Sequence, residues 1–157
     1  GRRIKEPMCF TPSGGPEPHC FGARNIVGVD VDFDARRLAR AELMLAGLPN
    51  CSLRRGNMYR LPFEDAEFDT IILDDVLAEA KYPVRVLNEA GRLLRLGGRI
   101  FVFLYIKKRS PIELQSQLAK WSAVAGLRLA PAKIAPKNDS QWLLSVATSL
   151  DHQSSVV

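Results

Sequence analysis

From residue 26 onward, short apolar runs alternate with longer segments in which apolar residues recur every three or four positions. The short runs predict buried strands, at residues 26–30, 51–54, 68–74 and 99–105. The longer segments predict helices, with start signals at Asp34, Pro83 and Ser110. Because parallel strands need a crossover between them and helices supply it, this alternation predicts an α/β domain with a mostly parallel sheet.

Each predicted helix has an apolar face that we expect to be buried. These faces consist of Leu38, Ala41 and Leu45 in the first helix, Leu87, Ala90 and Leu94 in the second, and Leu114, Leu118, Trp121 and Ala125 in the third. Glycines follow the helices, and Gly97 and Gly98 lead from the second helix into the strand at 99–105.

The last two predicted strands, at 127–134 and 142–148, have no helix between them. Strands joined directly pair as an antiparallel hairpin, so we expect an antiparallel edge on the otherwise parallel sheet. The domain is expected to span residues 24–150, with a frayed tail at 151–157.

Composition and charge exclude several classes of protein. The 157 residues suit one domain, and 46% hydrophobic with 25% charged residues exclude a disordered chain. The longest apolar run, 100–106, is too short for a membrane span. Three cysteines without a CxxC pair or the His spacing of a zinc site predict no metal and a reducing, cytoplasmic setting. The net charge of +5 leaves nucleic acid open as a partner, although solvated surfaces explain most of it.

An aspartate follows the first predicted strand. In open α/β sheets, ligands bind beyond the carboxyl ends of the strands, and an acid there commonly accepts hydrogen bonds from the two hydroxyls of a ribose. Alternatively, Asp30, Asp32 or Asp34 caps the next helix. Since Asp34 suffices as the cap, we favour ribose binding for Asp30.

Polar residues also follow the second and third predicted strands. After the second, the amide of Asn57 could pair with a purine edge while Met58 packs on the purine face, or the two residues form an ordinary turn. After the third, Asp74 and Asp75 could provide a general base or favour a cationic ligand. Alternatively, Asp75 caps a short helix at 76–80.

Four motifs connect these positions to a known family. They are GVD at 28–30, GNM at 56–58, LPFEDAEFD at 61–69 and RLLRLGGR at 92–99. In order and spacing they resemble the motifs of class I S-adenosylmethionine-dependent methyltransferases of the type 11-like group, over about residues 24–150. The resemblance implies a Rossmann-like, doubly wound sheet of seven strands with an antiparallel terminal strand, and S-adenosylmethionine as the cofactor.

The same resemblance implies roles for individual residues. Asp30 would hold the cofactor ribose, and Val31 and Met58 would pack on the adenine. Asn57 stands where the family usually has an Asp that binds the adenine amino group, and it keeps an acceptor oxygen. Asp74 and Asp75 would lie beside the methionine portion of the cofactor.

The first motif departs from the family pattern. Residues 4–12, IKEPMCFTP, stand where the family has a glycine-rich loop of the form E/D-x-x-x-G-x-G. Glu6 takes the place of the acid, but Phe10 and Pro12 replace both glycines. Phe adds bulk, and Pro fixes its own backbone angle and removes a donor. We therefore expect residues 1–23 to form a degenerate first strand and cofactor-loop region.

Two functions fit these features. The first is a working methyltransferase that acts on an unidentified small-molecule or macromolecular acceptor, with catalysis based mainly on positioning. Its catalytic residues stay unassigned, although Asp74 or Asp75 could accept the acceptor's proton. The second is a non-catalytic methyltransferase-like domain that serves as a partner or scaffold. We expect an upstream domain to select the acceptor; alternatively, the site is open to a large substrate, and a homo-oligomer is a further possible partner. An oxidoreductase is disfavoured because no G-x-G-x-x-G occurs.

Overall fold

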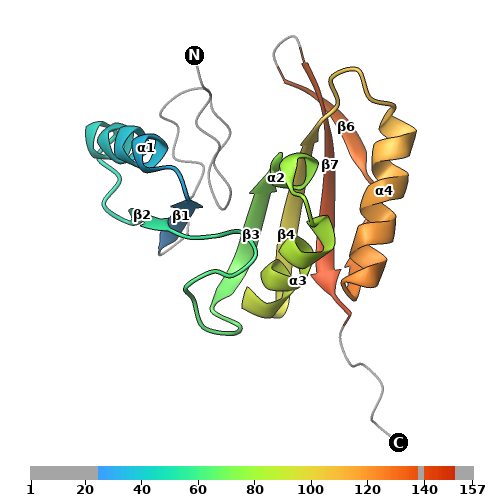
Figure 1. Cartoon of the computed structure of the whole chain (residues 1–157), viewed down its shortest axis with the longest axis horizontal. Coiled ribbons are helices and arrows are strands. Elements are labelled where there is room, and N and C mark those ends of the chain that lie inside the picture. Colours follow the sequence, from blue (N-terminus) through green and yellow to red (C-terminus); the bar gives the residue numbers. More distant parts are fainter. Residues whose placement is uncertain (1–24, 138–139, 151–157) are drawn as a thin grey trace, which may run out of the picture.

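The computed structural model describes residues 25–137 and 140–150, which form strands and helices in alternating order (Figure 1). The strands are β1 (Ile26–Asp30), β2 (Cys51–Arg55), β3 (Phe68–Asp74), β4 (Leu94–Tyr105), β5 (Leu127–Leu129), β6 (Lys133–Lys137) and β7 (Ser140–Ser149). The helices are α1 (Phe33–Leu45), α2 (Val76–Glu79), α3 (Pro83–Leu93) and α4 (Pro111–Val124). The predicted α/β class is confirmed, and the expected first strand within 1–23 lies outside the described residues.

The first unit is the parallel pair β1–β2 with α1 as its crossover. Asp32, in an extended conformation, is the N-cap of α1, and its Oδ1 accepts hydrogen bonds from the backbone N–H groups of Asp34 and Ala35 at 2.8 and 3.0 Å. The prediction of Asp34 as the cap was therefore wrong by two residues. A capping side chain must precede the N–H groups that it binds, and Asp34 already lies in the first turn.

The second unit is a sheet of order β3-β4-β7-β5, in which β6 also pairs with β7. β3 and β4 are parallel, and β7 runs antiparallel to β4, β5 and β6. The antiparallel terminal strand is confirmed, but it lies inside the sheet instead of at its edge. The strand expected at 127–134 is two strands, β5 and β6, separated by a segment that contains Pro131, which has no N–H for a ladder. Among the described residues no ladder joins this sheet to β1–β2.

The core lies between the second sheet and helices α3 and α4. Its fully buried side chains include Leu87 of α3, Leu118 of α4, and Ile100 and Val102 of β4. The buried faces predicted for these two helices are confirmed at Leu87, Ala90, Leu114 and Leu118. Leu94 is buried as well, but as the first residue of β4.

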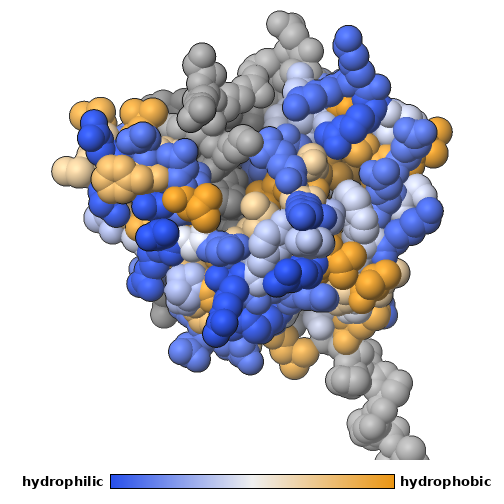
Figure 2. Space-filling model, viewed as in Figure 1, coloured by the Kyte–Doolittle hydropathy of each residue, from blue (hydrophilic) through white to orange (hydrophobic). Residues whose placement is uncertain are grey.

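Helix α1 differs from the others because none of its residues is buried. Leu38 is 53% exposed and Leu45 is 90% exposed, so the inward face predicted for this helix is wrong. Figure 2 shows apolar residues on the surface in this part of the molecule. The sheet that α1 accompanies is only two strands wide among the described residues, so it offers the helix little surface to cover. In the described part of the chain, no helix combines the length and apolar character needed to cross a membrane.

Candidate functional site

Asp30 is a nearly buried carboxylate at the carboxyl end of β1, with 9% of its surface exposed. Its Oδ1 accepts a hydrogen bond from the backbone N–H of Asp32 at 2.8 Å. Among the described residues, no hydrogen bond reaches its other oxygen, Oδ2. Because Asp32 caps α1, the capping alternative for Asp30 does not hold. Its side chain is left with an acceptor oxygen for a ligand.

The loop after β2 packs directly against β1. A Cβ built on Gly56 would lie only 2.4 Å from Cγ1 of Val29 and 3.1 Å from Cδ2 of Leu61, so only glycine fits there without a shift. The N–H of Gly56 also approaches the carbonyl oxygen of Asp30 at 3.4 Å. The structure thus brings the GNM segment to the end of β1, as the resemblance implied.

Asn57 and Met58 form part of a tight turn. The Oδ1 of Asn57 accepts a hydrogen bond from the N–H of Tyr59 at 2.9 Å, and its backbone oxygen accepts one from Arg60 at 3.0 Å. The turn expected as the alternative is therefore present. The exposed amide keeps its two donors and a second lone pair, and Met58 is half-buried against the core. Adenine contacts by these residues and by the 61% exposed Val31 stay predictions.

An ion pair on α3, not anticipated from the sequence, holds the segment after this turn. Glu89 accepts a hydrogen bond from the N–H of Leu61 at 2.7 Å and two from Arg92. Arg92 also donates to the carbonyl oxygens of Leu61 and Phe63 and to the carboxylate of Asp65, at 3.2, 3.0 and 2.7 Å. These bonds fix the path of the chain from 61 to 65. The one signal in the sequence was an acid and a base three residues apart on one helix.

The pKa values of Glu89 and Arg92 shift in the directions expected for two opposite charges in contact. Hydrogen bonds from Arg92, followed by the one from Leu61, lower the pKa of Glu89 despite its burial. The carboxylates of Glu89 and Asp65 raise the pKa of Arg92. Both side chains therefore stay charged at neutral pH.

Asp75 adopts a left-handed backbone conformation, with φ at 55°. Its N–H donates to the carbonyl oxygen of Phe103 at 2.8 Å, and its Oδ1 accepts from the N–H of Tyr105 at 3.0 Å. It occupies the N-cap position of α2, but its side chain makes no capping bond and turns to β4 instead. A non-glycine residue in this conformation is uncommon and concentrates at functional sites. The capping alternative for Asp75 is thus wrong at the level of the side chain.

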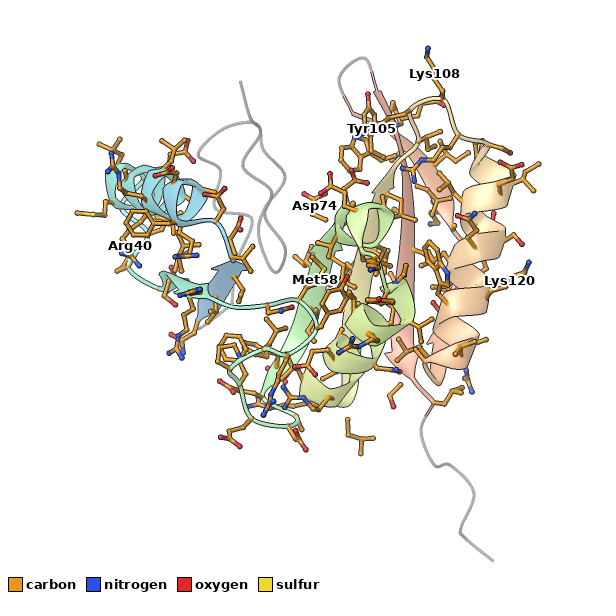
Figure 3. All side chains as sticks on the ribbon, in the orientation of Figure 1. Arg40, Met58, Asp74, Tyr105, Lys108 and Lys120 are labelled. Atoms are coloured by element: carbon orange, nitrogen blue, oxygen red, sulfur yellow. The ribbon has the colours of Figure 1, made fainter. Side chains whose placement is uncertain are left out.

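Asp75 lines an open cleft of about 800 Å³ at the carboxyl ends of β3 and β4. The other lining residues are Ala78, Glu79, Tyr105, Lys107, Lys108 and Arg109. Burial raises the pKa of the Asp75 carboxyl, against the opposing effects of the Tyr105 hydrogen bond and the nearby Arg109 and Lys107. Figure 3 shows that Asp74, at the end of β3, lies toward Tyr105 at this edge. The cleft lining therefore combines two carboxyl groups, those of Asp75 and Glu79, with three basic side chains.

The predicted site residues fall into two groups. One comprises Asp30, Val31, Asn57 and Met58 at the ends of β1 and β2, and the other comprises Asp74 with Asp75 at the end of β3. Among the described residues, no hydrogen bond or ion pair joins the two groups. Glu6 lies outside the described residues. No group of three or more potential ligands is placed to hold a metal ion in the part that the structure describes.

Comparison with known proteins gives a consistent result. Residues 15–102 match the family model described as a methyltransferase domain. The demethylmenaquinone methyltransferase of Listeria welshimeri is 31% identical over 86 residues, which are 55% of this chain and 34% of that protein. The chain thus spans about a third of the length of that relative.

Solved structures share the fold at low sequence identity. A methyltransferase of Haloferax volcanii, solved as a complex with the Trm112 methyltransferase activator, has a TM-score of 0.69 at 19% identity, covering 83% of this chain and 74% of that one. A SAM-dependent methyltransferase from Aquifex aeolicus has a TM-score of 0.66 at 16% identity, covering 78% and 68%. These neighbours confirm the Rossmann-like fold.

Proposed function

The chain belongs to the methyltransferase domain family, and we propose that it binds S-adenosylmethionine, the cofactor of that family, and transfers a methyl group to an acceptor. When bound, this cofactor supplies a methyl group on a positively charged sulfur. The observation that carries the proposal is Asp30, a nearly buried carboxylate at a strand end with one oxygen left for a ligand. The residues around it fit the nucleoside portion of such a cofactor.

The fit begins with the charge and polarity of the donor set. Ribose hydroxyls donate hydrogen bonds, and Oδ2 of Asp30 is an acceptor. Val31, the residue after Asp30, is exposed and offers an apolar surface to a purine face. Across from them, the loop after Gly56 brings the Asn57 amide and Met58 to the end of β1. This set offers one acceptor for the sugar, one polar group for the base edge and apolar cover for the ring.

Asp74 and Asp75 serve the other end of the site in this proposal. The acceptor would lose a proton on methylation, and a carboxylate at this end of the site would receive it. Burial raises the pKa of Asp75, which makes it a stronger base than an ordinary Asp. The hydrogen bond from Tyr105 fixes one of its oxygens and leaves the other for the acceptor. Positioning supplies most of the rate enhancement in such displacements.

Calorimetric titration with S-adenosylhomocysteine tests the proposal. We expect micromolar binding by the wild type and at least about tenfold weaker binding by Asp30→Asn, because a hydrogen bond to a charged acceptor is lost. Asn keeps an oxygen for the N–H of Asp32, so the local fold survives. The matched control is Asp34→Asn on the exposed first turn of α1. Absence of heat with the wild type would refute cofactor binding.

Thermal or urea unfolding gives an independent readout of the same binding. At 100 times the dissociation constant, S-adenosylhomocysteine should stabilise the wild type by about 2.7 kcal/mol. Asp30→Asn should show less stabilisation at the same ligand concentration, and Asp34→Asn should match the wild type. Equal stabilisation of all three proteins by S-adenosylhomocysteine would show that Asp30 does not contribute to binding.

A second candidate function is a non-catalytic partner or scaffold. The exposed apolar residues of α1 favour it, because Leu45 and Met44 of this helix are 90% and 77% exposed. The Haloferax neighbour, solved with an activator protein, is a precedent for a partner on this fold. Titration with S-adenosylhomocysteine separates the candidates, because a scaffold that has lost the cofactor site gives no binding.

A further inference from the structure

The turn between β4 and α4 holds three consecutive basic residues in a fixed place. The N–H of Ile106 donates to the carbonyl oxygen of Gln141 on β7 at 3.0 Å, and the N–H of Arg109 donates to the carbonyl oxygen of Ile106 at 2.9 Å. The Arg109 guanidinium also donates to the carbonyl oxygen of Tyr105. Lys107 takes a left-handed conformation, with φ at 49°. These bonds place Lys107, Lys108 and Arg109 along the rim of the cleft.

The basic residues of this rim outnumber the carboxylates that line the cleft. Neither Lys107 nor Lys108 forms an ion pair there, and the Lys107 ammonium lies over the Tyr105 ring, 5.4 Å from its centre. One nitrogen of the Arg109 guanidinium donates to the carbonyl oxygen of Tyr105, and its other N–H groups remain as donors for a ligand. The cleft lining therefore carries three basic side chains and two carboxylates, those of Asp75 and Glu79, so it has an excess of positive charge.

The acceptor's reacting group would lie at Asp75, which also lines the cleft. Asp75 is tied to β4 through the N–H of Tyr105, and the Tyr105 ring stacks on Trp142 with centres 5.1 Å apart. An oxygen or nitrogen nucleophile of the acceptor can donate to the Asp75 oxygen that the N–H of Tyr105 does not bind. The cleft volume of about 800 Å³ is within the range of sites for small molecules.

We propose that this cleft binds a small acceptor that carries a carboxylate or phosphate group, which Lys107, Lys108 and Arg109 hold while Asp75 faces the atom to be methylated. The proposal rests on the methyl transfer proposed above and specifies the class of acceptor. Basic side chains bind such anions through charge-assisted hydrogen bonds, and Arg does so in bidentate fashion. A neutral or cationic acceptor would provide no negative charge to pair with these three basic side chains.

The experiment compares phenols of similar shape and different charge. 4-Hydroxyphenylacetate, 4-hydroxyphenylacetamide and tyramine are negative, neutral and positive, and 4-hydroxybenzylphosphonate, which keeps the phenol hydroxyl, tests a phosphate-like group in place of the carboxylate. Binding is followed in the ¹⁵N-labelled chain through the amide resonances of Ala78 and Tyr105, with and without S-adenosylhomocysteine. We expect the anionic phenol to bind about tenfold more tightly than the neutral one, and tyramine to bind most weakly.

A charge-matched pair of variants tests the basic residues. Lys107→Gln/Lys108→Gln should weaken the preference for the anion, because only Arg109 remains to hold it, whereas Lys120→Gln/Arg128→Gln should retain the full preference. Lys120 is on α4 (Figure 3) and Arg128 is on β5, both exposed and outside the cleft. Thermal unfolding of each variant checks that it is folded.

Several outcomes would overturn the proposal. Equal affinities of the wild type for the three phenols, or an undiminished preference for the anion in Lys107→Gln/Lys108→Gln, would contradict the role of the rim. Tighter binding of a twelve-residue oligothymidylate at the same amides would assign the rim to nucleic acid. Because the phenols are also measured without S-adenosylhomocysteine, failure of cofactor binding is distinguishable from failure of anion selection.

Discussion

Arg92 and Glu89 form a two-point ion pair on one face of α3, with Nε 3.0 Å from Oε2 and Nη2 2.6 Å from Oε1. The same two side chains bind the backbone of Leu61 on both sides, because Glu89 accepts from its N–H and Arg92 donates to its carbonyl oxygen. α3 therefore fixes the segment that follows the proposed adenine-binding turn.

Arg92→Gln should destabilise the fold by about 2–3 kcal/mol, because it leaves the buried Glu89 carboxylate without its partner. Arg95→Gln is the control. Arg95 pairs with Asp69 at 3.3 Å on the exposed surface, so its loss should cost less than about 1 kcal/mol. Urea unfolding measures both. Similar losses for the two variants would contradict the assigned importance of the buried pair.

Glu89→Gln should change how stability depends on acid. The pKa of Glu89 is lowered in the folded state, so its contribution is complete above its ordinary value of 4.5 and is lost as the pH falls through the folded pKa. Gln cannot be protonated in this range. The free energy of unfolding of the wild type should therefore fall more steeply below pH 4.5 than that of the variant. Parallel curves would show that Glu89 is not the group responsible.

Gly56→Ala should cost about 1–3 kcal/mol, because the new Cβ would overlap Cγ1 of Val29. In a Val29→Ala background the same change should cost less, since the clashing methyl group is gone. Gly47→Ala is the control for backbone strain alone. Gly47 has φ at 65° and no atom within 4 Å of a built Cβ, so we expect about 1–2 kcal/mol that Val29→Ala does not relieve.

Asp75→Asn should raise the free energy of unfolding at pH 7. Burial raises the folded pKa of Asp75 above its ordinary 3.8, so its contribution is present at low pH and is lost as the pH rises through the folded pKa. Asn keeps the acceptor for the N–H of Tyr105 and tolerates the left-handed conformation. The advantage of the variant over the wild type should grow from pH 4 to pH 7.

Two further observations complete the Asp75 test. Glu42→Gln, on the exposed surface of α1, should show no such growth with pH. If Asp75 is the base, Asp75→Asn should lower the methyl-transfer rate while S-adenosylhomocysteine binding is unchanged. A variant that is less stable than the wild type at neutral pH would contradict the role given to burial.

Much of the fold was predictable because its signals are local. β1 and β3 have the predicted bounds, and α3 begins at the predicted Pro83, since apolar periodicity and Pro83 mark them. The predicted turn at Gly97 and Gly98 was wrong, because α3 ends at Leu93 and both glycines lie within β4, which begins at Leu94. The position of Asp30 at a strand end followed from the same local pattern. The shift of the α1 cap from Asp34 to Asp32 was a boundary error of the usual size.

The rest of the site depends on contacts between distant parts of the chain. The bond from Leu61 to Glu89 spans 28 residues, and that from Tyr105 to Asp75 spans 30. No local pattern encodes which backbone N–H a carboxylate will meet across a parallel pair of strands. The left-handed conformation of Asp75 was likewise hidden, because nothing in its sequence neighbourhood demands it. The exposure of α1 could not be predicted locally either, because it depends on the width of the sheet that the helix packs against, and that sheet has two strands among the described residues.

The place of β7 between β4 and β5 affects how this polypeptide matures during synthesis. β7 follows every other described strand in the chain, yet it supplies the hydrogen-bonding partner of β4 on one side and of β5 and β6 on the other. Until Ser149 has been synthesised, β4, β5 and β6 lack all or part of the strand with which each of them pairs. From the synthesis of Tyr105 to that of Ser149, one edge of β4 is therefore open to incorrect strand pairing.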